Sequence, residues 1–140
     1  MKILIAADGS DYTKRMLAYL AAHDEWLGPR HQYTVLNVVA AVPARAASAI
    51  DRDALKAYYA ETNEAVFKPI RSFFKKQGIE ADFVGKVGHA GEVIAKLADS
   101  QGFDLLVMGS HGHTVLGSLV MGSVSTKVLA GCKTPVLLIR

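Results

Sequence analysis

Residues 108–123 read MGSHGHTVLGSLVMGS and separate two apolar stretches of the chain. Residues 103–108, which precede this segment, are typical of a buried strand, and residues 124–130, which follow it, are typical of a helix. Four glycines lie in the connection between them. Connections from a strand to a helix are where α/β proteins usually place their ligand sites. The segment therefore predicts both an α/β fold and the position of a site.

Strand-like and helix-like patterns alternate along the rest of the chain. The expected strands are residues 2–7, 33–39, 79–87, 104–108 and 135–139, and the expected helices begin after residue 10, run from 55 to 78, and span 91–98 and 124–130. The long second helix is expected to bury an apolar stripe made of Leu55, Tyr59, Thr62, Val66, Ile70 and Phe73. The aromatic residues expected in the core are Tyr58, Tyr59, Phe67, Phe73 and Phe74. Pro69 lies inside this helix and predicts a kink or a break there. The small residues of 43–48 predict a mobile loop.

Five strands alternating with four helices predict a single doubly wound, five-stranded parallel sheet with helices on both faces. If the chain returns after the third strand to place the fourth beside the first, the strand order is 3-2-1-4-5. Residues 1–140 are enough for one domain with its own core. Ligands of such sheets bind where the order reverses, so a site is expected between residues 7–10 and 108–112.

The amino-acid composition argues against some classes of binding partner. The net charge of +3 comes from 16 basic and 13 acidic residues without a run of one sign, which argues against nucleic acid as the main partner. The single cysteine, Cys132, excludes an internal disulfide framework and fits a reducing compartment. No apolar stretch reaches the length of a signal peptide core or a membrane span. We therefore expect a cytoplasmic protein that does not bind membranes.

The glycines and the helix start in residues 108–123 suggest an anionic ligand. Gly109 and Gly112 let a ligand approach the backbone closely and tolerate positive φ. Gly122 and Ser123 open the next helix, whose free N–H groups and positive dipole end favour an anion. The hydroxyl of Ser123 could cap that helix or donate to a phosphate oxygen. We expect a phosphate-binding loop that matches neither a Walker loop nor G-x-G-x-x-G.

The spacing Gly109-x2-Gly112-x9-Gly122-Ser123 resembles the nucleotide-binding signature of the universal stress protein family, G-x2-G-x9-G-[ST]. Residues 3–10 resemble the family's first strand and turn, 36–39 its second strand, and 134–139 its closing strand. The similarity covers essentially all 140 residues. It implies a universal stress protein domain of the branch that binds adenine nucleotides.

The resemblance implies nine residues around a bound nucleotide. They are Asp8 near the ribose and adenine, the backbone of Val38 at the adenine edge, Gly109 and Gly112 along the ribose and phosphates, Gly122, Ser123 and Val124 at the phosphates, and Met108 and His111 packed around the ligand. The implied ligand is ATP, ADP or AMP, with or without Mg²⁺. The resemblance also implies a homodimer that pairs residues 136–139 of two subunits, and an unknown protein partner.

Simpler interpretations of individual residues remain open. Asp8 could cap the first helix or its turn, and Ser123 could be only an N-cap. His89, His111 and His113 could suggest a metal, but three scattered histidines without cysteine partners are weak evidence for zinc, and we expect no metal site.

Three functional classes fit these observations. The first is a homodimeric regulatory module that binds ATP in a stress response. The second is a slow ATPase or autophosphorylating enzyme, for which only Asp8 and one of Lys127 and His113 lie near the right loops. A nucleophile made from Ser110 and His111 is disfavoured because adjacent residues rarely face each other productively, so no catalytic residue is assigned. The third is a nucleotide-free dimer, against which the intact loop argues.

Overall fold

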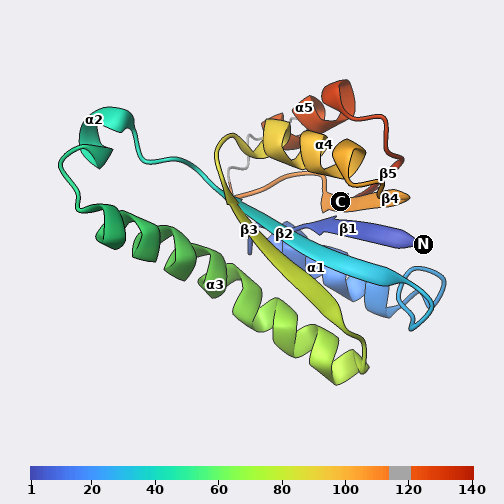
Figure 1. Cartoon of the computed structure of the whole chain (residues 1–140). Helices are drawn as coiled ribbons and strands as arrows, with labels where there is room; N and C mark the ends of the chain where they lie inside the picture. The colour runs from blue at the N-terminus through green and yellow to red at the C-terminus, as the bar shows by residue number, and fades with distance from the viewer. Residues whose placement is uncertain (114–120) are drawn as a thin grey trace.

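The computed structural model describes residues 1–113 and 121–140 (Figure 1). The middle of the expected phosphate-binding loop, residues 114–120, lies outside the described residues. The elements are β1 (Lys2–Ala6), α1 (Asp11–Ala21), β2 (Gln32–Val39), α2 (Ala44–Ala47), α3 (Arg52–Gln77), β3 (Ala81–Val87), α4 (Ala90–Ser100), β4 (Leu105–Gly109), α5 (Ser123–Gly131) and β5 (Val136–Ile139).

The five strands form one parallel sheet in the order β3-β2-β1-β4-β5, as the sequence predicted. β1 and β4 lie inside the sheet and are almost entirely buried, which explains their continuous apolar sequences. Ala6 of β1 pairs with Leu36 on one side and Met108 on the other. The carboxyl ends of the three middle strands therefore lie close together.

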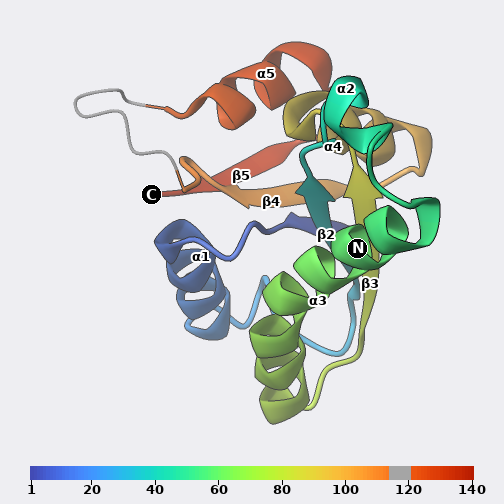
Figure 2. The same cartoon turned by 90° about the vertical axis from the view of Figure 1, so that its left-hand side faces the viewer.

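Helices cover both faces of the sheet, so the predicted doubly wound architecture is confirmed. Figure 2 shows α4 and α5 on one side of the strands and α1 and α3 on the other. Alternate residues of each strand point to opposite faces, and Ile3 and Ile5 of β1 join the core under α1 and α3. Leu4 and Ala6 join the core under α4 and α5. Each face thus has its own apolar layer.

Two local features differ from what the sequence suggested. α3 continues through Pro69 without a break, because Pro69 is exposed while its neighbours Phe67 and Ile70 are buried against the sheet and hold the helix in place. The segment expected to be a mobile loop contains α2, a single helical turn. Three of its four residues are alanine, the best helix former, which explains the turn.

The buried stripe of α3 also differs from the expected one. The buried side chains are Asn63, Phe67, Ile70 and Phe74, and residues 52–62 contain none. The first part of α3 extends beyond the sheet (Figure 1), which leaves Tyr58 50% exposed although it was expected in the core. No helix within residues 1–113 and 121–140 is long and apolar enough to cross a membrane.

A carboxylate at the end of α4 fixes the turn that leads into β5. Asp99 accepts hydrogen bonds from the backbone N–H groups of Lys133 and Thr134 and from the Thr134 hydroxyl, at 2.9–3.1 Å. The Lys133 N–H and the Thr134 hydroxyl lower the pKa of Asp99 below its ordinary value of 3.8. The ionised carboxylate therefore stabilises the folded chain.

We predict that Asp99→Asn lowers the free energy of unfolding at neutral pH. A carboxyl whose pKa is lower in the folded state stabilises that state above its ordinary pKa, and this contribution disappears as the pH falls through the folded value. The difference between wild type and variant should therefore shrink below about pH 4. Denaturant-induced unfolding at several pH values measures this difference in the free energy of unfolding. Asp24→Asn, at an exposed carboxylate, should show no such trend, and a constant difference for Asp99→Asn would contradict the prediction.

Candidate functional site

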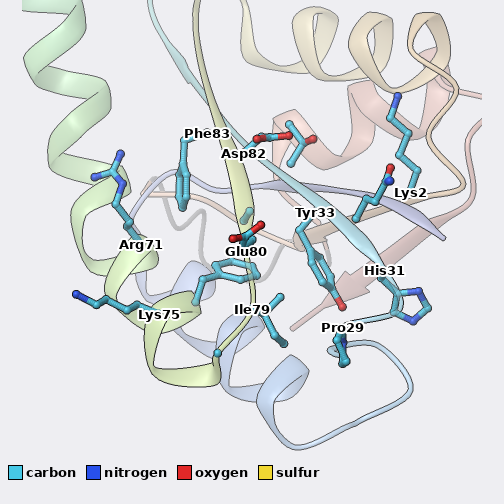
Figure 3. A pocket seen from close by; sticks show the side chains of 15 residues that line it. Lys2, Pro29, His31, Tyr33, Arg71, Lys75, Ile79, Glu80, Asp82 and Phe83 are labelled. Carbon is cyan, nitrogen blue, oxygen red and sulfur yellow. The ribbon is translucent and has the colours of Figure 1, made fainter.

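A cavity of about 490 Å³ lies beyond the carboxyl ends of β1, β2 and β4. A larger and more open hollow, of about 870 Å³, lies near the amino ends of β1, β2 and β3. Figure 3 shows this hollow, which is lined by Tyr33 and by side chains of both charge signs, Arg71 and Asp82 among them. Ligands of open α/β sheets bind outside the carboxyl ends of the strands, so the smaller cavity is the candidate site.

The structure brings all nine residues implied by the resemblance to this one cavity. Asp8 follows β1, Val38 lies on β2, Met108, Gly109, His111 and Gly112 come from β4 and its loop, and Gly122, Ser123 and Val124 surround the start of α5. Sequence reasoning had not assigned the remaining lining residues to a ligand: Ala6, Ala7, Thr13, Leu36, Asn37, Ala40, Ala90, Ile94, His113 and Ser125. Ala90 and Ile94 belong to α4, and no local signal relates that helix to the glycine-rich segment.

The turn after β1 is held by a closed set of hydrogen bonds. Asp8 Oδ1 accepts from the Ser10 N–H at 2.9 Å and from Thr13 Oγ1 at 3.0 Å. The same Thr13 oxygen accepts from the N–H groups of Asp8 and Gly9. Gly9 has φ of +79°, which favours glycine. Asp8 thus stabilises its turn, as the simpler interpretation held, while its Oδ2 accepts no hydrogen bond from the described residues.

The glycines around the cavity make room for close contacts. A Cβ on Gly112 would lie 2.6 Å from Asp8 Oδ2, and one on Gly109 would lie 2.8 Å from the Cβ of Tyr12. A Cβ on Gly122 would lie 3.3 Å from backbone atoms of the β4 loop. None of these three glycines adopts positive φ. The tolerance of positive φ noted for Gly109 and Gly112 is therefore not used, and the tight packing of the turn against the loop requires glycine instead.

Helix α5 points its amino end into the cavity. Gly122 is the N-cap, with φ of −75° and ψ of 166°, and Ser123 is the first helical residue. The simpler alternative, that Ser123 is only an N-cap, is therefore wrong, because Gly122 takes the extended conformation of a cap. The hydroxyl of Ser125 instead donates to carbonyl oxygens at the end of β4, at 2.9–3.1 Å. The start of α5 thus presents backbone N–H groups and the Ser123 hydroxyl to the cavity.

The histidines contact the loop backbone and a serine. Ser110 Oγ lies 2.9 Å from His111 Nδ1, so these adjacent residues do face each other, contrary to expectation. Ser110 is only 2% exposed and does not line the cavity, which keeps its hydroxyl away from a ligand there. His113 Nε2 donates to the carbonyl of Asp8 at 2.7 Å. Within the described ranges, no three histidine, cysteine or acidic residues form a group that could hold a metal.

The lining has little charge. Asp8 is the one acidic side chain among the described lining residues, and no lysine or arginine accompanies it. Lys127, which sequence reasoning placed near the loop, pairs instead with Glu92 of α4 at 3.0 Å and does not line the cavity. The lining thus combines apolar side chains from β2 and α4 with backbone donors from α5.

Comparison with known proteins places this geometry in a family. Residues 1–140 match the profile of the Universal stress protein family. The "Universal stress protein in QAH/OAS sulfhydrylase 3'region" of Thermus aquaticus is 34% identical over 139 residues, covering 99% of this chain and 97% of the relative. The solved structure of hypothetical protein MJ0577 of Methanocaldococcus jannaschii has a TM-score of 0.78 and 25% identity, with 99% and 94% of the chains covered.

A second solved structure shows the fold alone. The universal stress protein family protein from Arabidopsis thaliana, solved with AMP bound, is 18% identical, with a TM-score of 0.69 and coverage of 99% and 90%. The profile match and the Thermus relative span nearly the whole chain, and they agree with the strand order and the glycine spacing. The chain belongs to the universal stress protein family.

Proposed function

We propose that this protein binds an adenine nucleotide in the cavity and acts as a cytoplasmic, homodimeric module that regulates a stress response. The observation that carries the proposal is the convergence of nine residues, from four separate segments, on one cavity. ATP is the form we propose, with ADP or AMP as alternative ligands. Residues 1–140 would act together as one universal stress protein domain.

The amino end of α5 is suited to bind the phosphates of a nucleotide. Its free N–H groups and positive dipole end favour an anion, and the Ser123 hydroxyl adds a donor. Gly112 and Gly122 leave no side chain between these donors and a ligand. The carboxylate of Asp8 is the one acidic ligand that described lining residues could offer Mg²⁺, so a bound Mg²⁺ would depend mainly on the phosphates.

The carboxyl end of β2 is suited to form hydrogen bonds with the adenine base. The Leu36 carbonyl accepts from the N–H of Ala7, just after β1, whereas the Val39 carbonyl accepts from Gly88 after β3. Backbone groups of a strand alternate in direction, so the N–H and C=O of Val38 point toward β1. Because β1 ends at Ala6, these two groups face the space beyond it. One donor beside one acceptor complements the Watson–Crick edge of adenine.

Related proteins support a nucleotide rather than another anion. Besides the Arabidopsis protein with AMP, one universal stress protein was solved with cAMP, and the protein from Archaeoglobus fulgidus with dAMP. Efficient phosphoryl transfer needs a lysine or arginine clamp, and the described lining residues include neither. We therefore favour binding over the alternative of a slow ATPase or autophosphorylating enzyme.

We predict that the purified protein retains an adenine nucleotide or binds added ATP, and that Gly112→Ala weakens binding roughly tenfold or more because its methyl group would displace the Asp8 carboxylate. Chromatography of the denatured protein and calorimetric titration measure both effects. Gly131→Ala is the matched control, since its Cβ would meet only Ala95 at an ordinary 3.6 Å. A folded Gly112→Ala protein with wild-type affinity would refute the site.

The proposed homodimer would form through β5. β5 is an edge strand, and its residues Val136, Leu137 and Leu138 remain only half-buried. Apolar edge strands favour pairing with another chain, and a lysine on the edge opposes it. We predict a mass near twice 15.0 kDa for wild type and about 15.0 kDa for Val136→Lys in sedimentation equilibrium. Val87→Lys on the opposite edge strand should stay dimeric, and a monomeric wild type would contradict this part of the proposal.

A further inference from the structure

A buried amide pair lies between the cavity and helix α3. Asn37 of β2 is 4% exposed, and its Nδ2 donates to Asn63 Oδ1 at 2.9 Å. Asn63 of α3 is 9% exposed, and its Nδ2 donates to the carbonyl of Tyr59 at 3.1 Å. Two apolar side chains would fill this space without the cost of desolvating two amides. The presence of this polar pair therefore indicates a role that apolar residues could not perform.

The hydrogen bonds fix the direction of the Asn37 amide. The Tyr59 carbonyl can only accept, so Asn63 must direct its Nδ2 there and its Oδ1 toward Asn37. Asn37 must then use its own Nδ2 to reach that oxygen. Its Oδ1 is consequently turned away from Asn63, and a flipped amide would place two oxygens against each other.

The backbone of β3 provides the space for this arrangement. Gly85 lies opposite Asn37 in the parallel register of β2 and β3. A Cβ on Gly85 would lie 2.6 Å from Asn63 Nδ2, so any larger residue would displace the Asn63 amide. Three elements, β2, β3 and α3, thus hold one side-chain amide in one orientation. This explains a glycine in the interior of a strand, where glycine is otherwise unfavourable.

The Asn37 oxygen is left available to a ligand. Asn37 lines the cavity, and Oδ1 accepts no hydrogen bond from the described part of the chain. Within that part, the Ser10 hydroxyl is the one fully enclosed polar side-chain atom without a partner, so Asn37 Oδ1 keeps access to solvent. A lone acceptor of this kind can bind only a hydrogen-bond donor.

We propose that Asn37 Oδ1 determines base specificity by accepting a hydrogen bond from the 6-amino group of adenine. The inference rests on the proposed nucleotide function, which places the phosphates at α5 and the base at the end of β2. Guanine and hypoxanthine carry an oxygen at position 6, which would face the Asn37 oxygen and repel it. Asn63 acts as a positioning residue, because it prevents the Asn37 amide from turning its Nδ2 toward the cavity.

Calorimetric titration with ATP and inosine triphosphate tests the proposal. Wild type should bind ATP more tightly, and Asn37→Leu should weaken ATP binding roughly tenfold. The same change should tighten inosine triphosphate binding, because it removes the oxygen that repels the oxygen at position 6. Asn63→Leu frees the Asn37 amide to turn, so it should reduce the ratio of the two affinities although Asn37 is intact. Circular dichroism establishes that each variant is folded.

The outcomes separate this inference from the proposed function. A wild type that binds neither nucleotide overturns the proposed function itself. Suppose that wild type binds ATP and that folded Asn37→Leu keeps the wild-type ratio of the affinities for ATP and inosine triphosphate. This outcome overturns the role of Asn37 but leaves the proposed nucleotide binding intact. If Asn37→Leu does not fold, Asn63→Leu decides, and an unchanged ratio in that variant overturns the inference. An equal loss of both affinities in either variant would also overturn it, because it would show only a structural role.

Discussion

The parallel pairing of β1 with β4 is the contact on which the site depends. These strands are neighbours in the sheet, although two other strands separate them in sequence. Their register pairs Ala6 with Met108. Both strands end at the same level, so the turn that contains Asp8 meets the loop that contains Gly112. A shift of one residue would turn every side chain of β1 to the opposite face and separate them. The two apolar cores hold the register that forms the cavity.

The fold could be predicted because its signals are local and repeated. Continuous apolar strands alternate with helices, and the rules for parallel sheets then restrict the topology to few choices. The errors arose where packing overrides a local preference. Pro69 stays within a helix because adjacent residues are anchored in the core. The buried face of α3 was misplaced because Asn63, a polar residue, occupies it, and its partner lies 26 residues away on β2.

The position of the candidate site could be predicted from sequence, but the roles of its residues could not be fully assigned. The spacing of Gly109, Gly112 and Gly122 identified the loop, and its conformation shows that these glycines prevent clashes instead of adopting positive φ. A clash with Asp8 or Tyr12 depends on segments about 100 residues earlier, so no local pattern reveals it. The lining supplied by α4 was missed for the same reason, since tertiary packing alone brings that helix to the cavity.

The chemistry of the cavity follows from the way it is built. Fixed backbone N–H groups and one helix dipole can hold an anion without a basic side chain, and they leave its charge only partly neutralised. A phosphoryl transfer site must stabilise extra charge on the transferred group, which usually requires lysine, arginine or tightly held metal ions. At the other end, the Val38 backbone and the Asn37 amide are the groups that we propose select a base by hydrogen-bond direction. This combination of fixed backbone donors and directional polar groups is the physical basis of the proposed nucleotide binding.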